Sequence, residues 1–266
     1  MMGTTGAKRR TTGDLPPRSE RLFRWFRWYA RRYCAKHLHA VRLAKWGAAP
    51  TLVGPAIIVM NHPSWWDPLL AYVLSGLFPN RVHWGVIESE GLRQYRFLGR
   101  AGLFGVEPGT PRGARQFLCS ARAILADPGG TIWLTGQGRF ADVRERPTDL
   151  RAGVGHLASH LDSGVIVPLA VELTFWEQRT PEALAAFGEP LDCAGFQRSG
   201  REWTAAIEQA LESTQNRLAA DAISRDPSRF ELLIHGRAGV GGVYDVWRRM
   251  TAWLRSDRFS AEHQSK

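Results

Sequence analysis

Residues 56–67 read AIIVM-NHPSWWD, an apolar run that leads directly into a polar turn. The short run Ala56–Met60 predicts a buried strand, and residues 68–78 (PLLAYVLSGLF), apolar on nearly all sides, predict a buried helix. The turn between them lies at the carboxyl end of a strand, where α/β proteins place catalytic groups. We therefore expect functional side chains between residues 61 and 67.

Strands and helices alternate along the rest of the chain. Predicted strands cover 82–87, 103–106, 131–135 and 165–171, and predicted helices cover 110–126 and 202–222. The alternation predicts an α/β fold with a mixed, mostly parallel sheet covered by helices. Pro168 interrupts the last of these strands, so it is expected at an edge, a bulge or a strand end.

Charge and tryptophan content distinguish this chain from an ordinary globular enzyme. Its 266 residues are enough to bury a full core, and its hydrophobic and charged fractions of 44% and 23% are common. The net charge of +10 favours anionic partners, either nucleic acid or acidic phospholipid headgroups. Eleven tryptophans favour the membrane, because tryptophan suits the boundary between water and acyl chains. No nucleic-acid-binding motif is recognised, so we expect an anionic membrane surface and no nucleic acid as partner.

Cysteine usage and hydropathy bear on location. Cys34, Cys119 and Cys193 are scattered, without the spacing of a zinc site or a disulfide framework, and fit a reducing cytosolic setting. We therefore expect no bound metal. No uncharged stretch approaches the roughly 20 residues that cross a bilayer. These features predict a peripheral or monotopic protein on the cytoplasmic side of a membrane.

Residues 21–46 (RLFRWFRWYARRYCAKHLHAVRLAKW) predict a basic amphipathic helical segment, as one helix or a helix pair. Apolar residues recur in it at helical spacing, and arginines and lysines surround them. Such a segment suits a membrane interface. It equally suits an ordinary helix whose apolar stripe packs on the domain and whose arginines are solvated.

The other segments differ in composition. Residues 1–20 are polar and basic, without the apolar region of a secretory signal, and predict a disordered leader. Residues 47–225 form the predicted main domain, and residues 226–266 a basic, aromatic C-terminal extension. Within the extension, residues 236–242 lack the Lys-Ser/Thr of a phosphate loop and predict a flexible turn. Residues 243–259 predict a second basic aromatic helix.

His62 and Asp67 are the candidate catalytic pair. Pro63 keeps His62 out of helical geometry, and Asp67-Pro68 suits a helix start with aspartate as N-cap. The turn can bring the Asp67 carboxylate onto one ring nitrogen of His62 and leave the other free to take a proton. No GxSxG nucleophile motif is present, so the hydroxyl to be deprotonated should belong to the substrate. The alternative is that Asp67 only caps a helix and His62 is unrelated to it.

Asn61-His62 followed by Asp67 resembles the first signature, NHxxxxD, of the glycerolipid acyltransferase superfamily, which includes the lysophosphatidate acyltransferases. Three more blocks follow in the family's order: 102–106 (GLFGV) resembles the second block, 133–139 (WLTGQGR) the third, commonly FPEGTRS, and 167–169 (VPL) the fourth. The resemblance covers roughly residues 50–175 and makes residues 47–225 the expected acyltransferase domain.

The resemblance implies transfer of a fatty acyl group from acyl-CoA or acyl-acyl carrier protein, as co-substrate, to the hydroxyl of a lipid acceptor. No other cofactor is implied. His62 would be the general base and Asp67 would orient it and stabilise its imidazolium. The residues expected to bind substrate are Asn61, Arg112, Gln137, Gly138, Arg139 and Pro168. Among these, the third-block residues would hold the acceptor headgroup and Pro168 would lie near the acyl donor.

Two departures from the family pattern concern the acceptor. The second block usually ends in an arginine that grips phosphate, but its equivalent falls at Pro108, so Arg112 or Arg115 would have to replace it. Gln137 stands where glutamate is usual, and Arg139 is displaced by about one position. The acceptor is therefore left open between a lysophospholipid, a glycolipid, an amino-acid lipid and another membrane alcohol.

Two other functions remain open at this stage. A noncatalytic membrane- or lipid-binding protein on an acyltransferase fold would explain the altered blocks, whereas the intact His62–Asp67 pair argues for an enzyme. A thioesterase-like hydrolase would use water in place of the alcohol. Arg144 and Arg146 are candidate anion contacts or solvated loop charges. His156 and His160 are four residues apart, but without a third ligand they predict a surface helix face.

Overall fold

The computed structural model describes residues 15–195 and 198–236. Its strands form one sheet in the order β4-β3-β5-β2-β6-β7-β1-β9, with β8 paired to β6 beside this path. Pairs β4–β3, β3–β5, β5–β2, β2–β6 and β7–β1 are parallel, and pairs β6–β7, β6–β8 and β1–β9 are antiparallel. The strands are β1 Ala40–Ala44, β2 Ala56–Met60, β3 Val82–Glu88, β4 Leu103–Val106, β5 Gly130–Thr135, β6 Val165–Thr174, β7 Glu182–Phe187, β8 Leu191–Asp192 and β9 Phe230–His235. The predicted mixed, mostly parallel sheet is confirmed.

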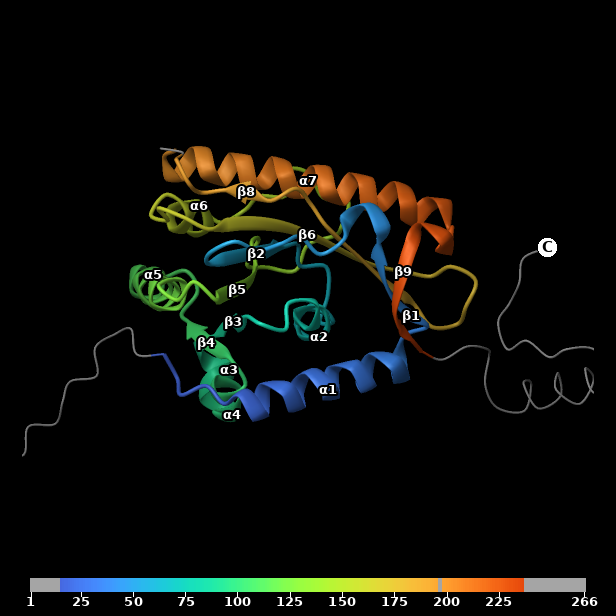
Figure 1. The fold of residues 1–266 in the computed structure, drawn as a ribbon, viewed down its shortest axis with the longest axis horizontal. Coiled ribbons are helices and arrows are strands. Elements are labelled where there is room, and N and C mark those ends of the chain that lie inside the picture. Colours follow the sequence, from blue (N-terminus) through green and yellow to red (C-terminus); the bar gives the residue numbers. More distant parts are fainter. Residues whose placement is uncertain (1–14, 196–197, 237–266) are drawn as a thin grey trace, which may run out of the picture.

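Helices cover both faces of this sheet, with α5, α6 and α7 on one face and α1 and α2 on the other (Figure 1). The helices are α1 Glu20–His37, α2 Asp67–Leu74, α3 Ser89–Gln94, α4 Phe97–Arg100, α5 Pro111–Leu125, α6 Gly153–Ala158 and α7 Gly200–Ser224. Three short 3₁₀ helices are η1 Lys45–Gly47, η2 Ser75–Leu77 and η3 Pro227–Arg229.

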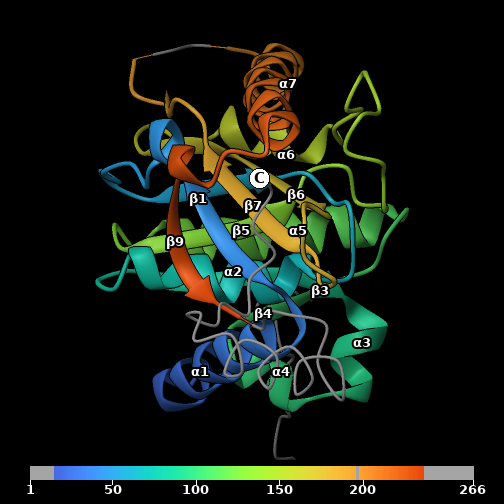
Figure 2. The same cartoon turned by 90° about the vertical axis from the view of Figure 1, so that its right-hand side faces the viewer.

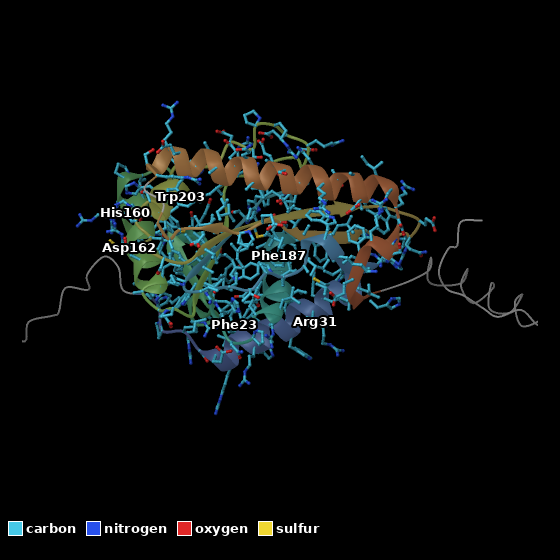
Figure 3. The ribbon with its side chains drawn as sticks, turned by 45° about the horizontal axis from the view of Figure 1, so that its top comes forward. Phe23, Arg31, His160, Asp162, Phe187 and Trp203 are labelled. Carbon is cyan, nitrogen blue, oxygen red and sulfur yellow. The ribbon has the colours of Figure 1, made fainter. Side chains whose placement is uncertain are left out.

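The strand β2 is apolar throughout because it is buried on both faces. Ile58 and Met60 belong to the core that includes α1 and α2, whereas Ile57 and Val59 belong to the core beneath α5, α6 and α7. Phe23 of α1 and Trp203 of α7, which can be located in Figure 3, are buried in these two cores. The turn that carries His62 therefore follows a strand that is buried throughout.

The segment 21–46 is only partly helical, which corrects the expectation of one helix or a helix pair. The helix α1 ends at His37, and Ala40–Ala44 forms the strand β1 between β7 and β9 (Figure 2). The reason is tertiary, because the small and branched side chains of β1 are buried in the sheet. The second half of this segment is therefore part of the main fold.

The terminal segments also join the main fold. Ser19 N donates to Arg100 O at 2.8 Å and Arg18 Nε to His83 O at 3.2 Å, so residues 15–20 are ordered rather than part of a disordered leader. Within the predicted extension 226–266, Phe230–His235 forms the strand β9 at the edge of the sheet. Residues 1–14, most of the turn predicted at 236–242, and the helix predicted at 243–259 lie outside the described residues.

Pro168 lies inside β6, not at a sheet edge or strand end. Upstream of it, Val165 and Ile166 pair with β8, and downstream the pairing with β7 begins at Leu169. The Pro168 carbonyl accepts a hydrogen bond from Gly188 N at 2.8 Å, in the gap between these two partners. Proline has no backbone N–H to donate. Here it stands between the segment of β6 that pairs with β8 and the segment that pairs with β7, so no hydrogen bond between these strands is lost and the buried strand tolerates proline.

Candidate active site

His62 and Asp67 meet at the carboxyl end of β2. His62 Nδ1 lies 2.6 Å from Asp67 Oδ2. The Asp67 side chain is fully buried, whereas 19% of the His62 side chain is exposed. Within the part of the chain that the structure describes, Nε2 of His62 has no hydrogen-bond partner. This is the geometry of a base whose second nitrogen faces an incoming proton donor.

Asp67 is held in place by the turn that precedes it. Ser64 donates to its carboxylate twice, from the backbone N at 3.2 Å and from Oγ at 3.4 Å. Burial raises the pKa of Asp67, and the hydrogen bonds from His62 and Ser64 partly offset this rise. Asp67 is the first residue of α2 and Trp66 precedes it as the cap, so the predicted N-cap role is wrong. Its carboxylate instead folds back over the turn.

The loop after β5 holds the His62 backbone from both sides. Gln137 Oε1 accepts from His62 N at 2.9 Å, and the His62 carbonyl accepts from Ala141 N at 3.0 Å. Gln137 is 4% exposed. Its amide oxygen therefore positions His62, and its predicted place beside the acceptor headgroup stays a prediction.

Asn61 joins the end of β2 to β6. Its Nδ2 donates to Val171 O at 2.9 Å, and its Oδ1 accepts from Val171 N at 2.8 Å. The residue is 2% exposed. The sequence predicts that Asn61 binds substrate. In the structure its side chain bonds the neighbouring strand and so fixes the backbone that leads into His62.

Gly138 and Arg139 belong to the same loop as Gln137. Gly138 has φ +60, a conformation that favours glycine, and a Cβ there would meet the Arg151 side chain. Arg139 forms an ion pair with Glu145 at the protein surface. The next residue, Phe140, places its ring 4.3 Å from the His62 ring, at an interplanar angle of 36°. Sequence reasoning missed Phe140, although it directly follows the third block.

Two predicted residues lie apart from this pair. Arg112 is exposed in the first turn of α5, which follows the edge strand β4, and both β3 and β5 lie between β4 and β2. Pro168 is buried within the sheet, in register with Val59. The structure therefore does not bring Arg112 or Pro168 to His62.

The other candidate residues make contacts within the protein. Arg144 pairs with Asp142, and Arg146 donates to Val143 O and to Asn216. The rings of His156 and His160 lie 4.6 Å apart. Among the residues that the structure describes, no group of three or more His, Cys, Asp or Glu side chains is placed to hold a metal ion.

An apolar cavity of about 80 Å³ has Asp67 of the His62–Asp67 pair in its wall. Its lining residues include Phe23, Met60, Asp67, Tyr72, His83 and Trp133. The polar groups in its wall are bonded within the protein: Tyr72 donates to Ala101 O at 3.0 Å, and His83 accepts from Trp133 Nε1 at 3.1 Å. The cavity therefore offers a mainly apolar surface beside the site.

Comparisons with known proteins support the fold. No protein-family model and no curated protein matches the sequence. Among solved structures, the chain is similar to the crystal structure of the 1-acyl-sn-glycerophosphate (LPA) acyltransferase PlsC from Thermotoga maritima, with a TM-score of 0.52 over 74% of this chain and 80% of that chain. The sequences are 15% identical, so the likeness is one of fold.

Proposed function

We propose that this protein transfers a fatty acyl group from an acyl thioester to a hydroxyl of a lipid acceptor, with His62 as general base. The observation that carries the proposal is the His62–Asp67 pair, with its free Nε2, beside an apolar cavity. The likeness in fold to an LPA acyltransferase supports the same reaction class.

In the proposed reaction, Nε2 of His62 takes the proton of the acceptor hydroxyl while the oxygen attacks the thioester carbonyl. The tetrahedral intermediate then collapses, the C–S bond breaks, and the imidazolium returns the proton to the departing thiolate. Asp67, ionised and bonded to Nδ1–H, holds the required tautomer and stabilises the imidazolium. A positioned base of this kind contributes about 10²–10⁴-fold in rate.

The hydroxyl is assigned to the substrate because the Ser64 hydroxyl, two residues from His62, is engaged on the Asp67 side of the turn. Ser64 Oγ bonds Asp67 and accepts from Trp66 N at 3.2 Å, so it sits with the carboxylate near Nδ1. A protein nucleophile would have to face Nε2. This arrangement favours direct transfer to an acceptor over an acyl-enzyme intermediate.

We propose that the apolar cavity receives part of the acyl chain. Met60 and Asp67 belong to its wall, so a chain entering there would bring its carbonyl end close to His62. Each methylene buried in such a cavity contributes about 0.8 kcal/mol. Donor binding would then depend on chain length, whether the thiol belongs to CoA or to acyl carrier protein.

The exposed face of α1 is the proposed contact with an anionic membrane. Its inner side packs on the fold through Phe23, Ala30 and Cys34. On its outer side, Trp25 and Trp28 are 50% and 54% exposed, among the basic residues Arg21, Arg24, Arg31, Arg32 and Lys36. Aromatic side chains that are half in solvent and flanked by cations suit a bilayer surface with acidic lipids.

Aromatic contacts connect α1 with the turn that carries His62. The Tyr33 ring lies 5.8 Å from Tyr29 on α1 and 6.1 Å from Trp65, which is 62% exposed and three residues from His62. No helix among the described residues has both the length and the apolar character to cross a bilayer. We therefore propose peripheral binding, with the turn that carries His62 facing the lipid.

The direct test is to incubate the purified protein with labelled acyl-CoA and a total lipid extract. We expect label in a lipid product with wild-type protein, and an initial rate lower by about a hundredfold or more with folded His62→Ala. Label in free fatty acid alone would mean a hydrolase, and no turnover with either acyl-CoA or acyl-acyl carrier protein would favour a noncatalytic lipid-binding protein.

A further inference from the structure

The His62 ring lies beside an aromatic side chain. Phe140 is 60% exposed, yet its ring lies 4.3 Å from that of His62. The loop cannot easily carry it away, because Ala141 N, the next residue, bonds the His62 carbonyl at 3.0 Å. An acceptor that presents its hydroxyl to His62 must therefore place its neighbouring atoms against Phe140.

The loop 136–151 carries four arginines. Two of them form ion pairs with carboxylates of the same loop, and the other two do not. Arg139 pairs with Glu145, and Arg144 pairs with both carboxylate oxygens of Asp142. The other two arginines donate largely to backbone carbonyls: Arg146 to Val143 O and Glu145 O, and Arg151 to Gln137 O and Gly138 O.

Two more carboxylates interact with these charges. Asp149 interacts with the charge of Arg139, and Glu172 at the end of β6 interacts with those of Arg144 and Asp142. Exposed ion pairs are individually weak and can open. Their carboxylates nevertheless remain beside the site, so a phosphate would meet their repulsion together with the attraction of the arginines.

Resting on the acyl-transfer function proposed above, we infer that the acceptor is uncharged next to its reacting hydroxyl, as in a monoacylglycerol or another neutral polyol lipid, and that Phe140 selects it. The carbon atoms of such an acceptor pack on the phenyl ring at little cost. A phosphate there would face the negatively polarised ring and the carboxylates that lie beside the site.

Arg112 and Arg115 do not supply a cation at His62. Both are exposed on α5, and among the described residues neither forms a hydrogen bond or an ion pair with His62 or with the loop 136–151. The inferred specificity thus rests on the residues next to His62.

The test compares two acceptors that share one acyl chain, monooleoylglycerol and oleoyl lysophosphatidate. Both are presented with oleoyl-CoA in mixed micelles that contain one fixed fraction of phosphatidylglycerol, so that surface charge is nearly matched. We expect wild-type kcat/KM to be higher for the neutral acceptor. Phe140→Arg adds a cation at the ring and should shift the neutral-to-phosphorylated ratio of kcat/KM towards lysophosphatidate by roughly ten- to a hundredfold, the scale of one charge-assisted hydrogen bond.

Two further variants separate specificity from folding. Glu145→Gln releases Arg139 with little change of shape and should shift the ratio in the same direction. Phe140→Tyr keeps the ring and should keep the ratio. Ile223→Ala removes a solvent-exposed apolar side chain on α7 and serves as control, with no shift expected.

The outcomes for the inference and for the proposed function differ. A wild-type preference for lysophosphatidate, or an unchanged ratio in both Phe140→Arg and Glu145→Gln, would overturn the inference and leave acyl transfer intact. Acylation of neither acceptor, with either fatty acid release or no turnover, would instead remove the acyl-transfer function.

Discussion

At the scale of single residues, the catalytic proposal depends on two side chains with separate tasks. His62→Ala removes the base and should lower kcat by about 10²–10⁴-fold, as expected for general base catalysis. Asp67→Asn keeps the shape but loses the charge that supports imidazolium, so a severe loss is expected here too. Steady-state kinetics on protein whose fold is verified by circular dichroism would check both. Wild-type rates for Asp67→Asn would show that the carboxylate serves only the turn.

The Asn61 amide offers a contrast at the same scale. It bonds Val171 on β6, so Asn61→Ala would leave two buried backbone groups without partners. Such a loss costs about 1–3 kcal/mol for each group left unsatisfied. We therefore expect a lower free energy of unfolding in urea titrations. Equal stability of Asn61→Ala and wild type would mean that this bond does not hold the strands together.

At the scale of elements, α1 has two faces with different tasks. Wild-type protein should sediment with vesicles rich in phosphatidylglycerol and only weakly with phosphatidylcholine vesicles. High salt should release it in part, because the Debye length falls from about 10 Å at 0.1 M to about 3 Å at 1 M, whereas buried aromatic area is less sensitive. The double variant Trp25→Ala/Trp28→Ala should reduce the bound fraction, with Ile223→Ala as the matched exposed control. Equal sedimentation of the double variant and the control would remove α1 from the membrane contact.

This test requires point substitutions, because a deletion of the N-terminal segment would also remove a strand of the sheet. Deletion of residues 1–46 would take away β1, which pairs with both β7 and β9, and would therefore damage the core. Trp25 and Trp28 are exposed, so alanine at these positions leaves the packed face of α1 in place.

At the scale of the whole molecule, a buried histidine links stability to pH. His83 is 3% exposed, and burial lowers its pKa from 6.5 to about 4. Between these values the unfolded chain binds a proton that the folded chain does not, so the free energy of unfolding falls as pH drops from about 6.5 to 4. The full contribution is roughly 3 kcal/mol.

Urea titrations between pH 4 and pH 7 would measure this dependence. His83→Gln cannot titrate, so its free energy of unfolding should vary less over this range than that of the wild type. The comparison uses the change with pH and not the absolute stability, since glutamine also alters packing against Trp133. The same pH dependence in both proteins would assign the effect to other groups.

Local patterns were sufficient where the structure is local. The buried strand 56–60, the helix start at Thr110, whose side chain caps α5, and the contact of His62 with Asp67 all involve residues within a few positions of one another. Local backbone geometry and burial determine the spacing of apolar residues and the type of capping residue, so both can be read from the sequence. The type of fold and the central pair of the site were therefore predictable.

Contacts between distant segments were decided by the tertiary structure alone. Ala40–Ala44 continues a helical pattern but becomes a strand, because β7 and β9 provide partners on both sides. Gln137, 75 residues from His62, holds its backbone, and Phe140 lies on its ring. Neither spacing nor residue type encodes which distant backbone a side chain will meet, because that depends on how strands order themselves in the sheet. The His62–Asp67 pair is thus local in origin, and the surroundings proposed to select a substrate are a product of the whole fold.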